Sequence, residues 1–387
     1  MTETFCKLIK DNTNKNEIEK VIKNMPRHML SLFHYFSLYC LSKNKGHVEI
    51  AKNILFYIDK LYYKPFTGTV TLTFGEVAES HVGMQKIGHM SENGFSLHDL
   101  KLAQKYFKNK GCNASIIKLN DYLPLENSIQ NLEEIKHLKI ARKEPEFEAY
   151  ILIVRDGLKC LDEKKENLLT ELLLFEWDTK LYNERRDIVQ NKNARHNLNF
   201  DKIGQVANFE EGKGTTIPWN NVPLVNKLKK SLVDAFGDSA KGLKCEGNKY
   251  YNYIKTGIGY HGDTERRKVI GVRLGKSMNM HFMWYYNFEP RGKNVSFVLN
   301  SGDIYCMSEK TVGTDWKANL SKGWINKRYT LRHAAGAPVY TTNTAKIKIK
   351  DIKPDIGDIN SGDIYYKPKK SVKNPKPEFT KISINTK

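Results

Sequence analysis

The chain has 387 residues and a formal net charge of +20, so it is long enough for two domains or for one large domain with a tail. Such a charge excess favours a polyanionic partner, nucleic acid before an anionic membrane surface, although solubility alone is an alternative explanation. The most apolar early segment, residues 29–41, is too short to cross a membrane, and the N-terminus lacks a signal-peptide pattern. We therefore expect an intracellular protein with no membrane segment.

The first 160 residues predict a separate α+β module of unknown role. Apolar residues recur at helical spacing in "MLSLFHYFSLYCL" and "VEIAKNILFYIDKLYY", and Ser96 is a predicted N-cap of a helix over 96–107. Strands are predicted in "GTVTLTF", "ASIIKLN" and "EAYILIVRDG". Glu79 and His81 lie close together in "GEVAESHVGMQKIG", but without a nucleophile or base nearby in the sequence a structural or surface histidine is favoured.

The remaining chain predicts three further parts. Residues 161–194 are expected to form a charged helical connector. Residues 195–351 contain many short strand-like segments with no long helices between them, which predicts an antiparallel barrel or jelly roll. Residues 352–387 are rich in Lys, Pro, Gly and Asp and predict a basic disordered tail.

The cysteines predict free thiols. The six are spread along the chain and form no C-x-x-C pair. This spacing argues against a zinc knuckle or a disulfide framework and agrees with a reducing compartment. We therefore expect the thiols to lie in the core.

Two incompatible motifs overlap in "TGIGYHGDTERR", residues 256–267. Its glycines match the G-x-G-x-x-G spacing of a dinucleotide-binding turn, but a β-like run replaces the required helix and no acidic residue follows from Arg266 to Phe288. The dinucleotide interpretation therefore fails. We expect the glycines to provide backbone freedom at a strand junction instead.

The second motif in this stretch is H-x-D, formed by His261 and Asp263. Residues two apart on extended backbone point to the same side, so the two side chains can bind one metal ion. An iron site needs a second histidine, and the chain offers His281 and His333 after Asp263. His333 is favoured because small residues follow it, whereas His281 lies in an aromatic strand that favours packing.

The region around this motif resembles a known family. "GNKYYNYIKTGIGYHGDTERRKVIGVRLG" is similar to the AlkB-type dioxygenases, which depend on Fe(II) and 2-oxoglutarate, in a form found in large DNA viruses and phages. Further similarity lies in "ARHNLNF", "TIPWNNVPLVNKLKKSL" and "LNSGDIYCMSEKTVGTDWK". The resemblance covers roughly 195–345, is most specific at His261, and implies a double-stranded β-helix (jelly-roll) domain.

The resemblance assigns roles to individual residues. It implies that His261 and Asp263 bind Fe(II) and that Asn248 and Tyr250 contact 2-oxoglutarate. The family usually places its second histidine near the position of Trp316, where this chain has none, so His333 must take that role.

The anchor for the distal carboxylate of 2-oxoglutarate also departs from the family, because no arginine follows Arg332. The candidates are Arg273, whose alternative role is an internal salt bridge, and Lys346 or Lys348. Glu265 matches a position that helps to recognise a base. Arg266 and Trp284 are candidate substrate contacts, with ordinary packing as the alternative.

The resemblance implies oxidative demethylation of alkylated nucleic-acid bases, with succinate, CO2 and formaldehyde as products. The substrate would be a single-stranded or flipped base, because a base inside a duplex cannot reach such a pocket. Two alternatives stay open: hydroxylation of a thymine or methylcytosine ring methyl or of a protein side chain, and a non-catalytic basic nucleic-acid-binding protein with a degenerate barrel.

Overall fold

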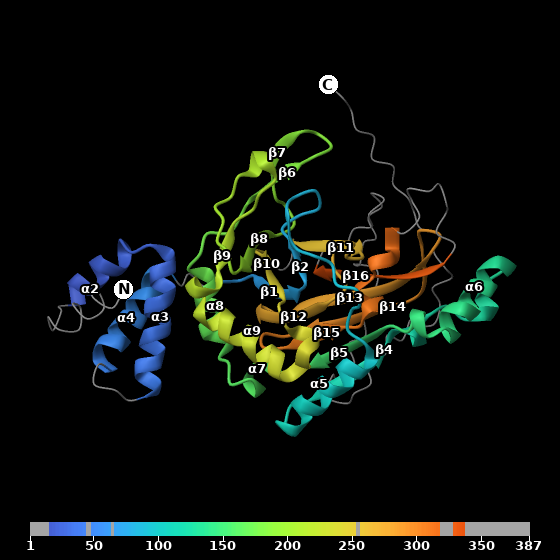
Figure 1. Ribbon diagram of the computed structural model, residues 1–387, viewed down its shortest axis with the longest axis horizontal. Coiled ribbons are helices and arrows are strands. Elements are labelled where there is room, and N and C mark those ends of the chain that lie inside the picture. Colours follow the sequence, from blue (N-terminus) through green and yellow to red (C-terminus); the bar gives the residue numbers. More distant parts are fainter. Residues whose placement is uncertain (1–14, 44–47, 63–65, 253–255, 318–327, 337–387) are drawn as a thin grey trace.

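The structure, a computed structural model, describes residues 15–43, 48–62, 66–252, 256–317 and 328–336. The candidate anchors Lys346 and Lys348 and the predicted tail 352–387 lie outside the described residues. The described chain has an α+β fold with an eight-stranded sheet, a four-stranded sheet and two short hairpins (Figure 1). Its strands form no closed barrel within the described ranges.

The N-terminal helices form a unit at one end of the molecule (Figure 1). They are α2 (Lys15–Lys23), α3 (Arg27–Ser42) and α4 (Val48–Tyr62), which confirms the helices expected from the apolar spacing. Their apolar faces pack together through Ile18, Phe33 and Ile54, all fully buried. The Ser31 hydroxyl of α3 donates to buried Glu171 at 3.2 Å and so ties this unit to the rest of the chain.

The eight-stranded sheet contains strands from both halves of the sequence. In spatial order these are β4 (Ala114–Lys118), β5 (Tyr150–Val154), β15 (Ile304–Met307), β12 (Val269–Gly275), β1 (Thr69–Gly75), β10 (Lys244–Tyr250), β8 (His196–Asp201) and β9 (Thr216–Pro218). Only the β8–β9 pair is parallel. Because β1 pairs with both β10 and β12, the predicted boundary near residue 160 is wrong. Strand pairing over such sequence distances is not visible in local patterns.

The four-stranded sheet comes from the second half of the chain. Its order is β11 (Gly257–His261), β16 (Tyr329–Gly336), β13 (Met278–Tyr286) and β14 (Glu289–Leu299). All four strands fall within the strand-rich region expected over 195–351. A separate hairpin pairs β2 (Val77–Glu79) with β3 (Lys86–Gly88).

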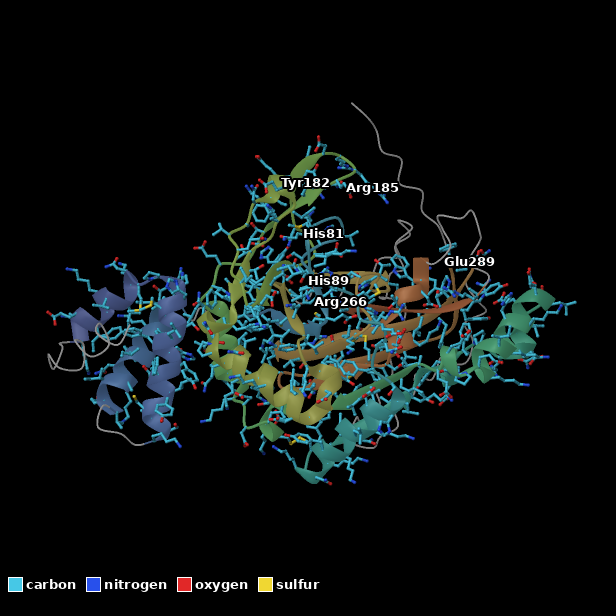
Figure 2. The ribbon with its side chains drawn as sticks, viewed as in Figure 1. His81, His89, Tyr182, Arg185, Arg266 and Glu289 are labelled. Atoms are coloured by element: carbon cyan, nitrogen blue, oxygen red, sulfur yellow. A yellow bond between two sulfur atoms is a disulfide. The ribbon has the colours of Figure 1, made fainter. Side chains whose placement is uncertain are left out.

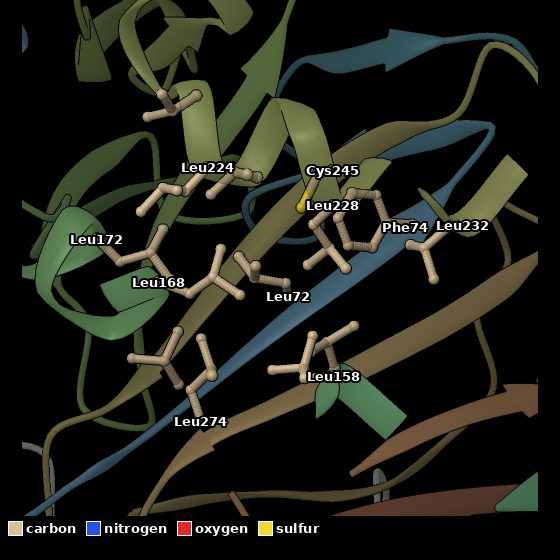
Figure 3. Packing of buried hydrophobic residues seen from close by; sticks show 14 of the residues in the cluster. Leu72, Phe74, Leu158, Leu168, Leu172, Leu224, Leu228, Leu232, Cys245 and Leu274 are labelled. Atoms are coloured by element: carbon tan, nitrogen blue, oxygen red, sulfur yellow. The ribbon is translucent and has the colours of Figure 1, made fainter. Parts of the chain in front are cut away.

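Helices cover one face of the eight-stranded sheet (Figure 3). They are α5 (Leu97–Asn109), α7 (Gly157–Cys160), α8 (Lys165–Leu173) and α9 (Pro223–Phe236). Leu72 and Phe74 of β1 face Leu168 and Leu228 of these helices in one apolar core. The predicted N-cap is confirmed, since the Ser96 side chain accepts from the Asp99 backbone N–H in a capping box.

The opposite face of this sheet packs against the four-stranded sheet. A second core joins Ile153 and Met307 of the large sheet to Phe282 and Leu331 of the small one. The helix α6 (Leu132–Lys143) and the short α10 (Glu309–Val312) also contribute to this core, through Leu138 and Val312. None of the helices in the described ranges combines the length and apolarity needed to cross a membrane.

The predicted helical connector over 161–194 is only partly helical. After α8 the chain forms a hairpin of β6 (Lys180–Asn183) and β7 (Ile188–Asn191). The turn is closed by the Arg186 backbone N–H, which donates to the Asn183 carbonyl at 3.1 Å, and Asp187 adopts a left-handed conformation with φ 52°. This hairpin, with Tyr182 and Arg185, projects from the same side of the molecule as His81 (Figure 2).

The cysteine prediction is wrong for one pair. Cys112, just before β4, forms a disulfide with Cys160 at the end of α7. Cys245 and Cys306 are free and buried, as expected, and Cys40 is free and partly exposed. Spacing along the chain did not reveal the pair, because the two residues meet only through the fold.

Candidate metal centre

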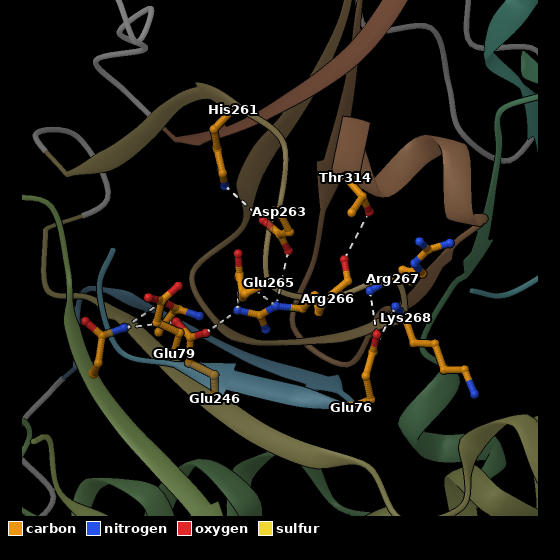
Figure 4. Close-up of polar contacts among 12 residues, drawn as sticks. Glu76, Glu79, Glu246, His261, Asp263, Glu265, Arg266, Arg267, Lys268 and Thr314 are labelled. Atoms are coloured by element: carbon orange, nitrogen blue, oxygen red, sulfur yellow. Dashed lines mark hydrogen bonds and ion pairs between the residues drawn. The ribbon is translucent and has the colours of Figure 1, made fainter. Parts of the chain in front are cut away.

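Three predicted ligands converge between the two sheets. His261 ends β11 and faces His333 on the neighbouring strand β16, with 4.3 Å between the ring centroids. Asp263 Oδ1 lies 3.4 Å from His261 Nε2 (Figure 4). It lies 3.6 Å from His333 Nε2. One potential ligand atom from each residue lies within 4.8 Å of the others, so the three side chains could hold one metal ion.

The structure brings His333, and not His281, next to His261 and Asp263. His281 lies on β13 opposite Ala334, outside the three-residue cluster. Its side chain is 1% exposed, and burial lowers its pKa to about 4. His281 is therefore a packed histidine of the small sheet.

Hydrogen bonding and burial favour the protonation states that bind metals. His261 Nδ1 lies 2.8 Å from the Gly259 carbonyl, which assigns the proton to Nδ1 and leaves the Nε2 lone pair facing Asp263. Burial, together with the nearby His261, lowers the pKa of His333 to about 3. His333 is therefore a neutral imidazole at physiological pH, the form that donates an electron pair to a metal.

Asp263 completes the donor set as a carboxylate. Burial by itself would raise the pKa of Asp263, but Arg266 and the two histidines lower it below its ordinary value. Two imidazoles and one carboxylate on the same side of a site match the donor set of non-haem Fe(II) enzymes. The residues present therefore fit an iron ion.

Gly262 lies between the two ligands of the H-x-D motif and packs closely against Gly313. A Cβ atom at Gly262 would lie 2.0 Å from the Gly313 carbonyl oxygen, and the next residue, Asp263, donates its backbone N–H to the Val312 carbonyl at 3.1 Å. Gly257, Gly259 and Gly262 do not have positive φ. The expectation of special backbone freedom is therefore wrong, and Gly262 serves close packing instead.

A pocket open to solvent surrounds the ligands. Both sheets line it, with residues Thr71, Thr73, Arg195, Glu246, Asn248, Tyr250, Ile258, His261, Asp263, Arg266, Val269, Arg273, Met280, Tyr305, Met307, His333 and Ala335. The predicted co-substrate residues Asn248, Tyr250 and Arg273 are all among them. The fold thus brings both sets of predicted residues to one cavity.

Asn248 has a fixed orientation in this pocket. Its Oδ1 accepts hydrogen bonds from Arg195 Nε and, at 2.8 Å, from Asn197 Nδ2. Because Oδ1 receives both donors, Nδ2 is the atom that can donate to a ligand.

Arg273 is a buried cation without an ion-pair partner among the described residues. The side chain is 1% exposed, Nη1 donates to Thr71 Oγ1 at 2.6 Å, and Nε has no hydrogen-bond partner in the described chain. The internal salt bridge considered as an alternative is not present among the described residues. A buried, incompletely bonded guanidinium is costly unless an anion binds it, and its fork suits a carboxylate.

The structure places the predicted substrate contacts Trp284, Arg266 and Glu265 in different surroundings. Trp284 is 1% exposed, donates Nε1 to the Leu119 carbonyl at 2.8 Å and packs in the core between the sheets, so its prediction as a substrate wall is wrong. Alternation along β13 turns it to that core. Arg266 lines the pocket; Glu246 and Glu265 accept from its Nη2 at 2.7 and 2.8 Å, while its Nη1 has no hydrogen-bond partner among the described residues. Glu265 is held by its ion pair with Arg266.

Several pocket residues were missed from the sequence. Thr71 and Thr73 alternate with buried apolar residues in β1, a pattern that marks a polar strand face. The pattern could not show that this face meets the metal centre, because β1 was assigned to another module. Tyr305 and Glu246 had no distinguishing local pattern.

Comparison with known proteins places the chain in a family. No protein-family model matches it. It is 40% identical over 268 residues to "Uncharacterized protein R156" of Acanthamoeba polyphaga mimivirus, an alignment that covers 69% of this chain and 95% of the relative. The chain therefore belongs to the family of this mimivirus protein.

Proposed function

We propose that this protein is an Fe(II)- and 2-oxoglutarate-dependent dioxygenase that demethylates alkylated nucleic-acid bases. The observation that carries the proposal is the convergence of His261, Asp263 and His333 in a pocket that also contains an unpaired buried arginine, Arg273. A structural cluster would explain the triad, but it would not explain a guanidinium left without a carboxylate in the same cavity.

The pocket offers complementary groups for the co-substrate. 2-Oxoglutarate carries a carboxylate at each end, and Arg273 can bind the distal one through its fork while Thr71 orients the guanidinium. Asn248 Nδ2 and the hydroxyl of Tyr250 line the same pocket and can donate further hydrogen bonds. No lysine beyond residue 336 is needed for this arrangement.

We also propose that the two facing sheets form the double-stranded β-helix of this enzyme class. The large sheet contributes Asn248, Arg273 and Tyr305 to the pocket, and the small sheet contributes His261 and His333. A ligand cavity between two packed antiparallel sheets is the arrangement expected of a jelly roll.

Fe(II) at the triad would supply oxidation of a substrate C–H bond with dioxygen and 2-oxoglutarate. The chain itself supplies two imidazoles, of which that of His333 is neutral, an ionised carboxylate, and a pocket that an unstacked base could enter. The net charge of +20, together with Arg195 in the pocket lining, supports a phosphate-bearing substrate.

The test is turnover with a single-stranded oligonucleotide that carries an N-methylated base. We expect Fe(II)-dependent formation of succinate and formaldehyde in equal amounts, and loss of both in His333→Ala. Succinate without formaldehyde would indicate hydroxylation of a ring methyl or of another substrate instead. Neither product, together with no Fe(II) binding, would overturn the enzyme proposal.

A further inference from the structure

The two oxygens of the Asp263 carboxylate have different partners. Oδ1 faces His261 Nε2 and His333 Nε2. Oδ2 lies 3.4 Å from Nε of Arg266 (Figure 4). The carboxylate is therefore oriented with one oxygen toward the other metal ligands and one toward a cation.

Arg266 is itself held rigidly. Its Nε and Nη2 both donate to Glu265 Oε1, at 3.0 and 2.8 Å, and Nη2 also donates to Glu246 Oε2 at 2.7 Å. The arginine side chain is 5% exposed and those of Glu246 and Glu265 are 2% and 9% exposed, so solvent screens these ion pairs weakly. Two carboxylates thus hold the guanidinium. Its single Nε–H donates to Glu265, so the 3.4 Å contact between Nε and Asp263 Oδ2 is an ion pair and not a hydrogen bond.

We propose that Arg266 is a positioning residue that makes Asp263 bind the metal through Oδ1 alone. This inference rests on the proposed function. A carboxylate that binds through both oxygens would occupy two of six coordination positions, and with two histidines it would leave two. Binding through one oxygen leaves three, which are needed for a two-point 2-oxo acid and for dioxygen. Glu246 and Glu265 are part of this device because they hold Arg266.

Arg267 provides a matched control. It is the next residue and also forms an ion pair, from Nη1 to Glu309 Oε1 at 2.6 Å, but this pair lies away from the ligands (Figure 4). Arg266→Lys keeps the charge and removes the fork, and Arg267→Lys makes the same change where no metal ligand is contacted.

The experiment uses Co(II) as the probe in the full-length protein. Absorption intensity of bound Co(II) reports the coordination number, and titration with 2-oxoglutarate measures how well the remaining positions accept it. For Arg266→Lys we expect a changed Co(II) spectrum and a loss of 2-oxoglutarate affinity of about 10–100-fold, the usual effect of removing a partner of a metal ligand. Arg267→Lys should match the wild type in both measurements.

An Arg266→Lys protein with wild-type spectrum and wild-type 2-oxoglutarate affinity would overturn the inference, even if its melting temperature falls. Should Arg266→Lys not fold, Glu265→Gln weakens the same support, and we expect a smaller shift of spectrum and affinity in the same direction. A Glu265→Gln protein with the wild-type Co(II) spectrum and the wild-type 2-oxoglutarate affinity would then overturn the inference. A wild-type protein that binds no Co(II) would overturn the proposed function itself.

Discussion

The two faces of the eight-stranded sheet are built from the same strands and differ in almost every physical property. On β1, Leu72 and Phe74 face the helices in a dry apolar core, while Thr71 and Thr73 face the pocket. On β12, Leu274 faces the helices and Arg273 the pocket. Strand alternation thus separates a stabilising face from a reactive one at single-residue intervals.

The two faces affect the free energy of folding in opposite directions. Burial of a large apolar core stabilises the fold, and the pocket face holds Arg273 out of water at a cost in free energy. A ligand anion or cation can offset that cost at the pocket face, but not at the helix face. Substitutions on the two faces should therefore change different measured quantities.

Leu72→Ala should have the largest effect on stability. Leu72 is fully buried against α8 and α9, and removing such a side chain costs about 2–5 kcal/mol. Denaturant unfolding of the metal-free protein measures this loss. The folded fraction should keep the metal affinity of the wild type, and a large loss of metal affinity would contradict the separation of the two faces.

Arg273→Met should weaken 2-oxoglutarate binding without lowering the stability of the fold. It removes the buried cation that faces the pocket, and a hydrogen-bonded charge contributes about 1.5–3 kcal/mol, so the KM for 2-oxoglutarate should rise roughly 10–100-fold. Stability should stay the same or rise, because an uncompensated buried charge is removed. An unchanged KM would exclude Arg273 as the carboxylate anchor.

Thr71→Val should have a smaller effect on 2-oxoglutarate binding than Arg273→Met. The substitution keeps the shape and removes the hydroxyl that accepts from Arg273 Nη1 at 2.6 Å. One such hydrogen bond is worth about 1 kcal/mol, so the KM for 2-oxoglutarate should rise roughly fivefold. In an Arg273→Met background the change should have no further effect on KM, and additive effects would argue against a shared role.

Glu171 gives the helix-covered side a pH dependence of its own. Burial raises the pKa of its carboxyl from 4.5 to about 8, despite hydrogen bonds from the Leu224 and Val225 backbone N–H groups. The folded state therefore holds this proton more tightly, and stability should fall as pH rises from 4.5 toward 8. Glu171→Gln should flatten this fall by at most about 1.4 kcal/mol per pH unit. If denaturant unfolding shows that stability changes with pH equally in the wild type and in Glu171→Gln, this assignment is wrong.

Local patterns predicted much of the fold and most of the site. Ser96 marked its helix start, and H-x-D together with a later histidine strand identified His261, Asp263 and His333. The patterns failed where distant segments pair, since nothing local places β1 between β10 and β12. The disulfide between Cys112 and Cys160 was missed for the same reason.

The polar residues around the ligands were harder to assign than the ligands. Arg266 is charged and follows the motif closely, so it was assigned to the substrate, whereas its partners Glu246 and Glu265 turn it toward Asp263. Trp284 was misassigned because a strand of consecutive aromatic residues does not show which of them face the core.

The most direct test of the metal centre is anaerobic titration of the purified protein with Fe(II), in the wild type, His333→Ala and His281→Ala. We predict one bound Fe(II) per wild-type chain and an affinity loss of at least about 100-fold in His333→Ala, since even a partner of a ligand contributes 10–100-fold. His281→Ala should bind Fe(II) like the wild type, because His281 lies outside the triad. Equal Fe(II) affinity in His333→Ala and the wild type would contradict the assignment of this site.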